Sequence, residues 1–122
     1  MARRGPGETN YLEFVPRRAV DHEDGDDGRL VLLRPKWTRG VMARWLQPRI
    51  QRKFFHVRLD EVGTATWQLI DGSRSVGDIC EALFELFGER VEPRFERGAK
   101  FIRQLERGEM VAVDPPAAGA GA

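Results

Sequence analysis

The sequence predicts an α+β domain, with an antiparallel sheet in the first half of the chain and three helices in the second. Alternating and continuous apolar runs mark strands before residue 60. Helical periodicity with clear start and stop signals marks residues 60–107. Gly-rich and Pro-rich stretches lie at both ends of the chain.

Residues 14–22 and 29–34 are predicted as the first two strands. The acidic, Gly-containing loop 22–28 between them indicates an antiparallel hairpin. The acids of this loop lack the spacing and the bidentate Glu of an EF-hand, so we expect a solvated hairpin tip rather than a calcium site.

Residues 54–59 alternate as a third strand. Phe55, Val57 and Leu59 are expected to face the core. The opposite set is expected to face outward and comprises Phe54, His56 and Arg58. An exposed Phe beside His and Arg indicates a contact surface.

Three amphipathic helices follow. Asp60 is the expected N-cap of the first helix, and Asp71-Gly72 ends it. Its apolar stripe comprises Val62, Ala65, Thr66, Leu69 and Ile70, with Trp67 at the flank. Ser75 with Asp78 forms a capping box for the second helix, which Gly88 ends. The buried face of the second helix comprises Val76, Ile79, Cys80, Leu83 and Phe87.

The third helix is expected from Pro93, a suitable first helical residue, to Arg107. Its buried stripe comprises Phe95, Gly98, Ala99, Ile102 and Leu105. One flank of that stripe carries Arg94, Arg97, Phe101 and Gln104. Residues 110–113 indicate a short terminal strand or wing.

The domain is expected to span residues 14–113, between a flexible N-terminus (1–13) and a disordered tail (114–122). A basic, Trp-containing insertion at 36–53 is either an amphipathic helix for a membrane surface or acidic partner, or a short helix covering the sheet. A single Cys, no signal peptide and no long apolar run favour a cytoplasmic protein without a transmembrane segment.

The segments at 59–63, 67–72 and 75–79 together resemble the PqqD-like family: Leu59-Asp60-Glu61-Val62-Gly63, Trp67-Gln68-Leu69-Ile70-Asp71-Gly72 and Ser75-Val76-Gly77-Asp78-Ile79. The resemblance covers residues 16–113, and the insertion at 36–53 departs from the compact members. It implies a winged-helix-like fold, with three antiparallel strands followed by three helices. It also implies a non-catalytic, bacterial peptide chaperone, a recognition element for ribosomally made precursor peptides. Such domains bind the leader of a precursor and present it to a modifying enzyme, often a radical SAM protein.

In this family the leader lies as an added strand beside the third strand, in a groove shared with the third helix. An edge strand recruits an extended peptide through unpaired N–H and C=O groups. The expected peptide-binding residues are Phe54, His56, Val57, Arg58, Arg94, Arg97, Phe101 and Gln104. For Phe101 a core position, and for the arginines a solvated position, are equally compatible with the pattern.

Two other functions are open. Three helices and a wing also fit a DNA-binding regulator with the third helix in the major groove, but the near-balanced charge of that region and a net charge of +1 argue against nucleic acid. The exposed strand could instead form a homodimer. His22 and His56 are isolated and Cys80 lies on an apolar stripe, so the sequence predicts no enzyme, no metal and no cofactor.

Overall fold

The computed structural model describes residues 10–35 and 54–116. The predictions for residues 1–9, 36–53 and 117–122, the basic insertion among them, lie outside the described residues. The strands are β1 (Val15–Arg18), β2 (Asp21–Asp24), β3 (Leu30–Pro35), β4 (Phe54–Arg58) and β5 (Val111–Asp114). The helices are α3 (Glu61–Leu69), α4 (Val76–Phe87) and α5 (Arg94–Arg107). Short 3-10 turns complete the fold, namely η1 (Tyr11–Glu13), η2 (Asp26–Gly28) and η3 (Gly88–Val91).

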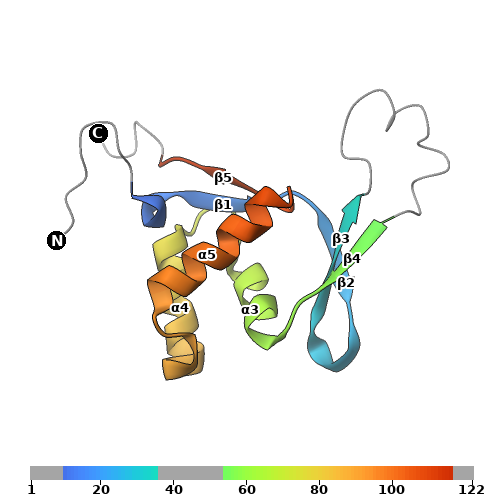
Figure 1. The fold of residues 1–122 in the computed structure, drawn as a ribbon, viewed down its shortest axis with the longest axis horizontal. Helices are drawn as coiled ribbons and strands as arrows, with labels where there is room; N and C mark the ends of the chain where they lie inside the picture. The colour runs from blue at the N-terminus through green and yellow to red at the C-terminus, as the bar shows by residue number, and fades with distance from the viewer. Residues whose placement is uncertain (1–9, 36–53, 117–122) are drawn as a thin grey trace.

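The strands form two separate sheets. One is the antiparallel pair β1–β5, and the other is the antiparallel sheet β2–β3–β4, which lies beside the helices (Figure 1). The prediction of one strand over residues 14–22 is therefore wrong. The chain bends at Ala19 and Val20, so that β1 pairs with the terminal strand while β2 pairs with β3.

The hairpin between β2 and β3 is tighter than predicted. Residues 22–24, expected in the loop, belong to β2, and the connection is η2 with its flanking residues. The terminal strand is present as predicted, one residue offset, and continues to Asp114. Ordered structure begins before residue 14, because η1 packs on α4, where Val76 donates its N–H to the carbonyl of Phe14 at 2.8 Å.

The register of the three-stranded sheet fixes which residues share a face. Leu32 lies opposite His22 on β2 and Val57 on β4, and this row faces the core, since Leu32 is fully buried. Leu33 lies between Asp21 and His56 on the outer face. The outer face is thus acidic along β2, apolar along β3 and basic along β4.

The local helix signals are confirmed. The carboxylate of Asp60 accepts a hydrogen bond from Gly63 N at 2.7 Å. Ser75 and Asp78 form the reciprocal capping box of α4. Gly88 ends α4 with φ +63°, a conformation that a side chain disfavours. The α5 helix begins one residue later than predicted, with Pro93 at its N-cap.

The core lies between the helices and the inner face of the β2–β3–β4 sheet. Trp67 is 0% exposed, so its predicted place at the flank of the stripe is wrong. Its indole N–H donates to His22 Nδ1 at 3.1 Å, which satisfies the only polar atom of the buried ring. The guanidinium of Arg18 donates to Trp67 O at 2.9 Å. These contacts hold the β1–β2 bend against α3.

A close contact between α4 and α5 depends on Gly98. A Cβ atom at this position would collide with the sulfur of Cys80. Gly98 thus allows the two helix backbones to approach, and Ile102 and Leu105 are buried beside it as predicted. Phe95, however, is 38% exposed, so its place in the buried stripe was predicted wrongly.

In the described part of the chain, no helix is long and apolar enough to cross a bilayer.

Candidate functional site

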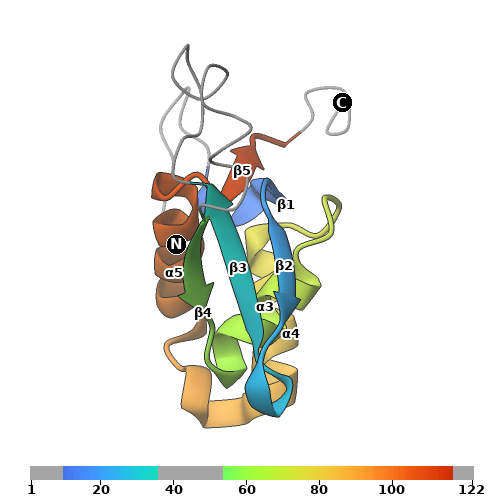
Figure 2. The ribbon, with the colours of Figure 1, turned by 90° about the vertical axis from the view of Figure 1, so that its right-hand side faces the viewer.

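Strand β4 is an edge strand. It pairs with β3 alone, and no other strand of the described residues lies against its opposite side. Figure 2 shows β4 on the margin of the sheet nearer to α5, with β2 on the opposite margin. This is the margin that the sequence predicts to recruit a peptide.

The hydrogen-bond pattern shows which backbone groups of β4 are open. Leu59 N donates to Leu30 O at 3.0 Å, so the backbone of Leu59 faces β3. Because the direction alternates along an antiparallel strand, Val57 also faces β3. The N–H and C=O groups of Phe54, His56 and Arg58 therefore point away from the sheet. Three residues, each with one donor and one acceptor, offer six backbone groups.

The side chains of β4 are divided between two faces. His56 and Arg58 are exposed on the outer face, opposite Leu33 and Val31. Phe54 is half-buried on that same face and lines a shallow depression that also contains Leu33 and Pro35. Val57 is half-buried against the core on the inner face.

Phe55 lies on the inner face as predicted. It is 47% exposed, however, so the prediction that it packs into the core is wrong. It sits near the open end of the strand, where the guanidinium of Arg34 lies 5.7 Å from its ring. The same guanidinium donates to Gly108 O at 2.6 Å. This contact links the start of β4 to the end of α5.

The other end of β4 meets the middle of α5. A Cβ atom on Gly63 would lie 3.3 Å from the Cζ atom of Phe101 and 3.1 Å from Asp60 Oδ1. Glycine at this position therefore lets the Phe101 ring rest on the first turn of α3. Together with the contact at Gly108, this shows that α5 runs alongside β4 in the opposite direction.

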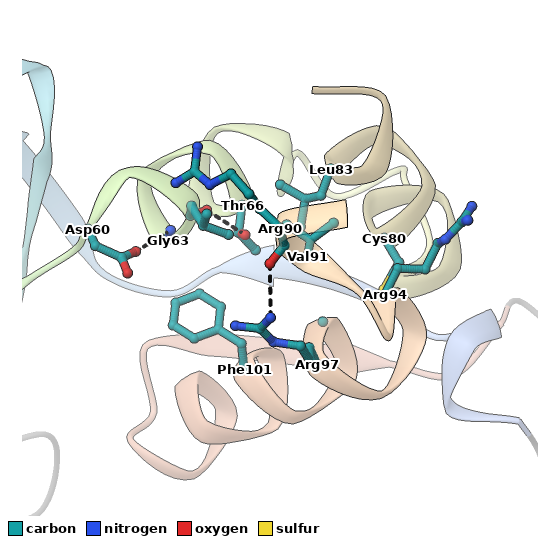
Figure 3. A pocket seen from close by; sticks show the side chains of 12 residues that line it. Asp60, Gly63, Thr66, Cys80, Leu83, Arg90, Val91, Arg94, Arg97 and Phe101 are labelled. Carbon is teal, nitrogen blue, oxygen red and sulfur yellow. Dashed lines mark hydrogen bonds between the residues drawn. The ribbon is translucent and has the colours of Figure 1, made fainter. Parts of the chain in front are cut away.

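Phe101 lines a pocket of about 200 Å³ between α3, α4, η3 and α5 (Figure 3). Leu83, Val91 and Cys80 contribute apolar walls, and Asp60 marks the end nearest β4. The pocket thus lies just beyond the last residue of β4. A side chain from a strand added to β4 would find an apolar cavity at that end.

Two predicted arginines line the same pocket, but internal partners hold both. Arg94 forms ion pairs with Glu81 at 2.7 Å and Glu92 at 2.9 Å, and its guanidinium lies 3.7 Å from the centroid of Phe84. Hydrogen bonds from Arg94 lower the pKa of Glu92, while those to Glu92 and then Glu81 raise the pKa of Arg94. Arg94 therefore chiefly stabilises the packing of α5 against α4.

Arg97 lies beside Phe101, and its guanidinium points to the η3 turn (Figure 3). It donates to Arg90 O at 2.9 Å and to Glu92 O at 3.3 Å. These two bonds use one terminal nitrogen, and the exposed guanidinium remains at the pocket wall. A carboxylate at the mouth of the pocket would meet a fixed cation there.

Gln104 lies apart from this group. It is exposed and lines a different groove, shared with Tyr11 and Arg103. The structure therefore brings Arg94, Arg97 and Phe101 into one pocket and the four β4 residues onto one strand, but Gln104 joins neither set. The side chains of β4 do not line the pocket of Phe101.

Several pocket residues were absent from the predicted site. Gly63, Thr66 and Val91 line the cavity, and Arg90 stands at its rim, where it pairs with Glu61 at 3.2 Å. Gly63 carried a usable signal, because glycine within the first turn of a helix is costly unless close packing requires it. Val91 carried none, since a short 3-10 turn has no distinctive pattern.

The described residues contain no group of three or more His, Cys, Asp or Glu side chains that could hold a metal ion. Burial, and secondarily Glu81, raises the pKa of the Cys80 thiol to about 11. At neutral pH Cys80 is a protonated, buried apolar group, as the sequence predicts, rather than a nucleophile.

Comparison with known proteins identifies a family. The family model for coenzyme PQQ synthesis protein D (PqqD) matches residues 30–111, which run from the start of β3 to the start of β5. No curated protein and no solved structure matches the chain. The matched region includes the edge strand, the pocket and helices α3, α4 and α5, and it covers more than half of the chain. This chain belongs to the PqqD family, whose members are accessory proteins in the biosynthesis of ribosomally made, modified peptides.

Proposed function

We propose that this protein binds the leader of a ribosomally made precursor peptide as an added strand on β4 and presents it to a modifying enzyme. The observation that carries the proposal is the open edge of β4, with outward backbone groups at Phe54, His56 and Arg58. Family membership supports the class of ligand.

The pocket of Phe101 supplies the second element of recognition. Backbone hydrogen bonds select an extended chain but not its sequence, whereas a pocket at one end selects a side chain and so fixes the register. An apolar leader residue suits Leu83, Val91 and Phe101, and an acidic neighbour suits Arg97.

The energies fit a transient complex. Six backbone hydrogen bonds at about 1 kcal/mol each contribute about 6 kcal/mol, and one buried apolar side chain adds about 2 kcal/mol. Ordering the peptide costs about 2–5 kcal/mol, and association costs more. The sum leaves binding weaker than micromolar, which suits a carrier that must release its cargo.

In this role the protein carries out no chemistry itself and works in the cytoplasm, where precursor peptides are made. The β1–β5 pair, whose second strand follows α5, would serve as the wing of a winged-helix-like domain. A radical SAM enzyme is the partner that the family resemblance suggests.

The proposal is tested with a proline in the edge strand. His56→Pro removes one outward N–H and places the proline ring where the peptide would lie, while the bonds between β4 and β3 remain. Binding of a synthetic leader, taken from the precursor gene nearest to this gene, is measured by titration calorimetry. We expect at least a tenfold loss of affinity, about 1.4 kcal/mol.

Two controls separate the backbone from other effects. His56→Ala keeps the N–H and should retain most of the affinity. Asp24→Pro makes the equivalent change on the opposite edge, where the N–H of Asp24 also points outward, and should leave affinity unchanged. Equal binding by His56→Pro and wild type, or equal losses on both edges, would refute strand addition at β4.

A further inference from the structure

Helix α5 has a second exposed flank that the peptide site does not use. Together with η1 it forms a groove of about 540 Å³. Tyr11, Leu12, Phe95 and Ala99 supply its apolar surface, and Lys100, Arg103 and Arg107 its cationic one. The three cations follow at helical spacings of three and four residues, so they form one row on the exposed face.

This row of cations differs from two of the three arginines around the Phe101 pocket. Arg90 and Arg94 are each paired with carboxylates. Among the residues that the structure describes, no carboxylate lies within ion-pair distance of Lys100, Arg103 or Arg107. Glu96 is the one acid in the lining of the groove, so the groove has an excess of positive charge.

The aromatic wall of the groove is fixed in place. Tyr11 donates its hydroxyl proton to Glu106 at 3.2 Å, and the guanidinium of Arg103 lies 4.3 Å from the centroid of the Tyr11 ring. Burial, and secondarily Glu106, raises the pKa of Tyr11 to about 12, so the phenol remains a hydrogen-bond donor at neutral pH. A ligand would meet a preformed surface rather than loose side chains.

Phe95 is the exposed apolar element of this surface. Phe95 is 38% exposed and lies in the lining of the groove beside the row of cations. The combination suits a ligand that presents an apolar side chain to Phe95 and carboxylates to the row of cations.

We propose that the groove between η1 and α5 binds an acidic protein segment with an apolar anchor residue. On the proposed function, which this last assignment assumes, that segment belongs to the enzyme that receives the peptide. The peptide and the enzyme would then contact opposite flanks of the same helix, and the two could be bound at once.

The test uses the full-length ¹⁵N-labelled protein and two synthetic decapeptides. In the acidic peptide two Glu residues alternate with two Phe residues, and in the basic peptide Lys replaces every Glu. We expect the acidic peptide to shift the amide signals of residues that line the groove, namely Tyr11, Leu12, Phe95, Lys100, Arg103 and Arg107, more than those of Arg97 and Phe101 in the other pocket. The basic peptide should leave them unchanged. Lys100→Glu should weaken binding of the acidic peptide about five- to tenfold.

Arg29→Glu is the matched control, because it makes the same change in net charge on the exposed β2–β3 connection, and it should bind like wild type. Equal binding of both peptides, no shifts in the groove, or equal losses in the two variants would overturn the proposal. A 16-base-pair DNA duplex could instead shift the same amide signals, bind with higher affinity than the acidic peptide and lose affinity steeply with added salt. That result would overturn the proposal in favour of nucleic acid.

Neither outcome depends on the leader. Lys100→Glu should bind the leader as wild type does, and His56→Pro should bind the acidic peptide as wild type does. Failure of the groove and failure of the β4 edge are therefore seen separately.

Discussion

The two edge strands of the three-stranded sheet, β2 and β4, differ in how readily they can pair with a further strand. β2 carries Asp21, Glu23 and Asp24, has two residues with outward backbone groups, and is tied to the core through His22. β4 offers three such residues, Phe54, His56 and Arg58, and has a pocket at one end. Like charges in register disfavour pairing, so the acidic margin is protected from other strands while the other is available.

The largest effect is expected where α5, the helix that runs alongside β4, packs against α4. Gly98→Ala places a methyl group against Cys80 and should lower the free energy of unfolding by about 2–3 kcal/mol, because the helices must separate. Urea unfolding measures this. The double variant Cys80→Ala/Gly98→Ala removes the sulfur and should recover most of the loss. Failure to recover would mean that the contact does not limit the helix spacing.

The protection of β2 can be removed directly. Glu23→Thr/Asp24→Thr deletes two charges and raises strand propensity, so the margin should become able to pair with a second copy. We expect roughly a tenfold rise in the self-association constant by sedimentation equilibrium. His56→Thr/Arg58→Thr is the matched change on β4. If the β2 variant stays monomeric, the negative charges are not what prevents β2 from pairing with a second copy.

The chain has two histidines, one on each margin, and they allow a direct comparison. His22→Ala removes the acceptor of the buried Trp67 N–H and should cost about 1 kcal/mol of stability. His56→Ala removes an exposed side chain and should cost less than about 0.5 kcal/mol. Thermal unfolding of both variants checks the difference, which equal costs would contradict.

The smallest effect concerns alkaline pH. Because the pKa of Cys80 rises from 9.0 to about 11 in the folded state, the protein keeps this proton longer when folded. Its contribution is therefore complete below pH 9 and is lost as pH rises through 11. At pH 9.5 wild type should lose about 0.8 kcal/mol relative to pH 8 that Cys80→Ala does not lose. Parallel urea titrations measure this, and identical losses would contradict the burial of the thiol.

What could be predicted from the sequence was local. Asp60, Ser75 with Asp78, and Gly88 act on atoms within four residues, so their patterns are readable without a fold. The open margin at β4 followed from the family resemblance and the alternation of its residues. The break between β1 and β2 was not predictable, because β1 pairs with a strand more than ninety residues later.

The candidate site shows the same limit. Phe101 and Arg97 were correctly grouped by helical periodicity, which places them on one flank. The sequence could not show that Arg94 would be neutralised by Glu81 and Glu92, or that Gln104 would turn to the other groove. Such outcomes depend on which helix packs alongside, and that is decided by close contacts such as the one at Gly63.

The position of the Phe101 pocket has one more consequence. It lies at one end of β4 only, so one leader side chain in the pocket would fix the register of the whole leader along the strand. The distance in residues from the anchor to the modified site would then be constant among the substrates of one enzyme. Inserting two residues between the anchor residue and the modified residue would move the modification to a different side chain. The affinity for the leader would stay the same.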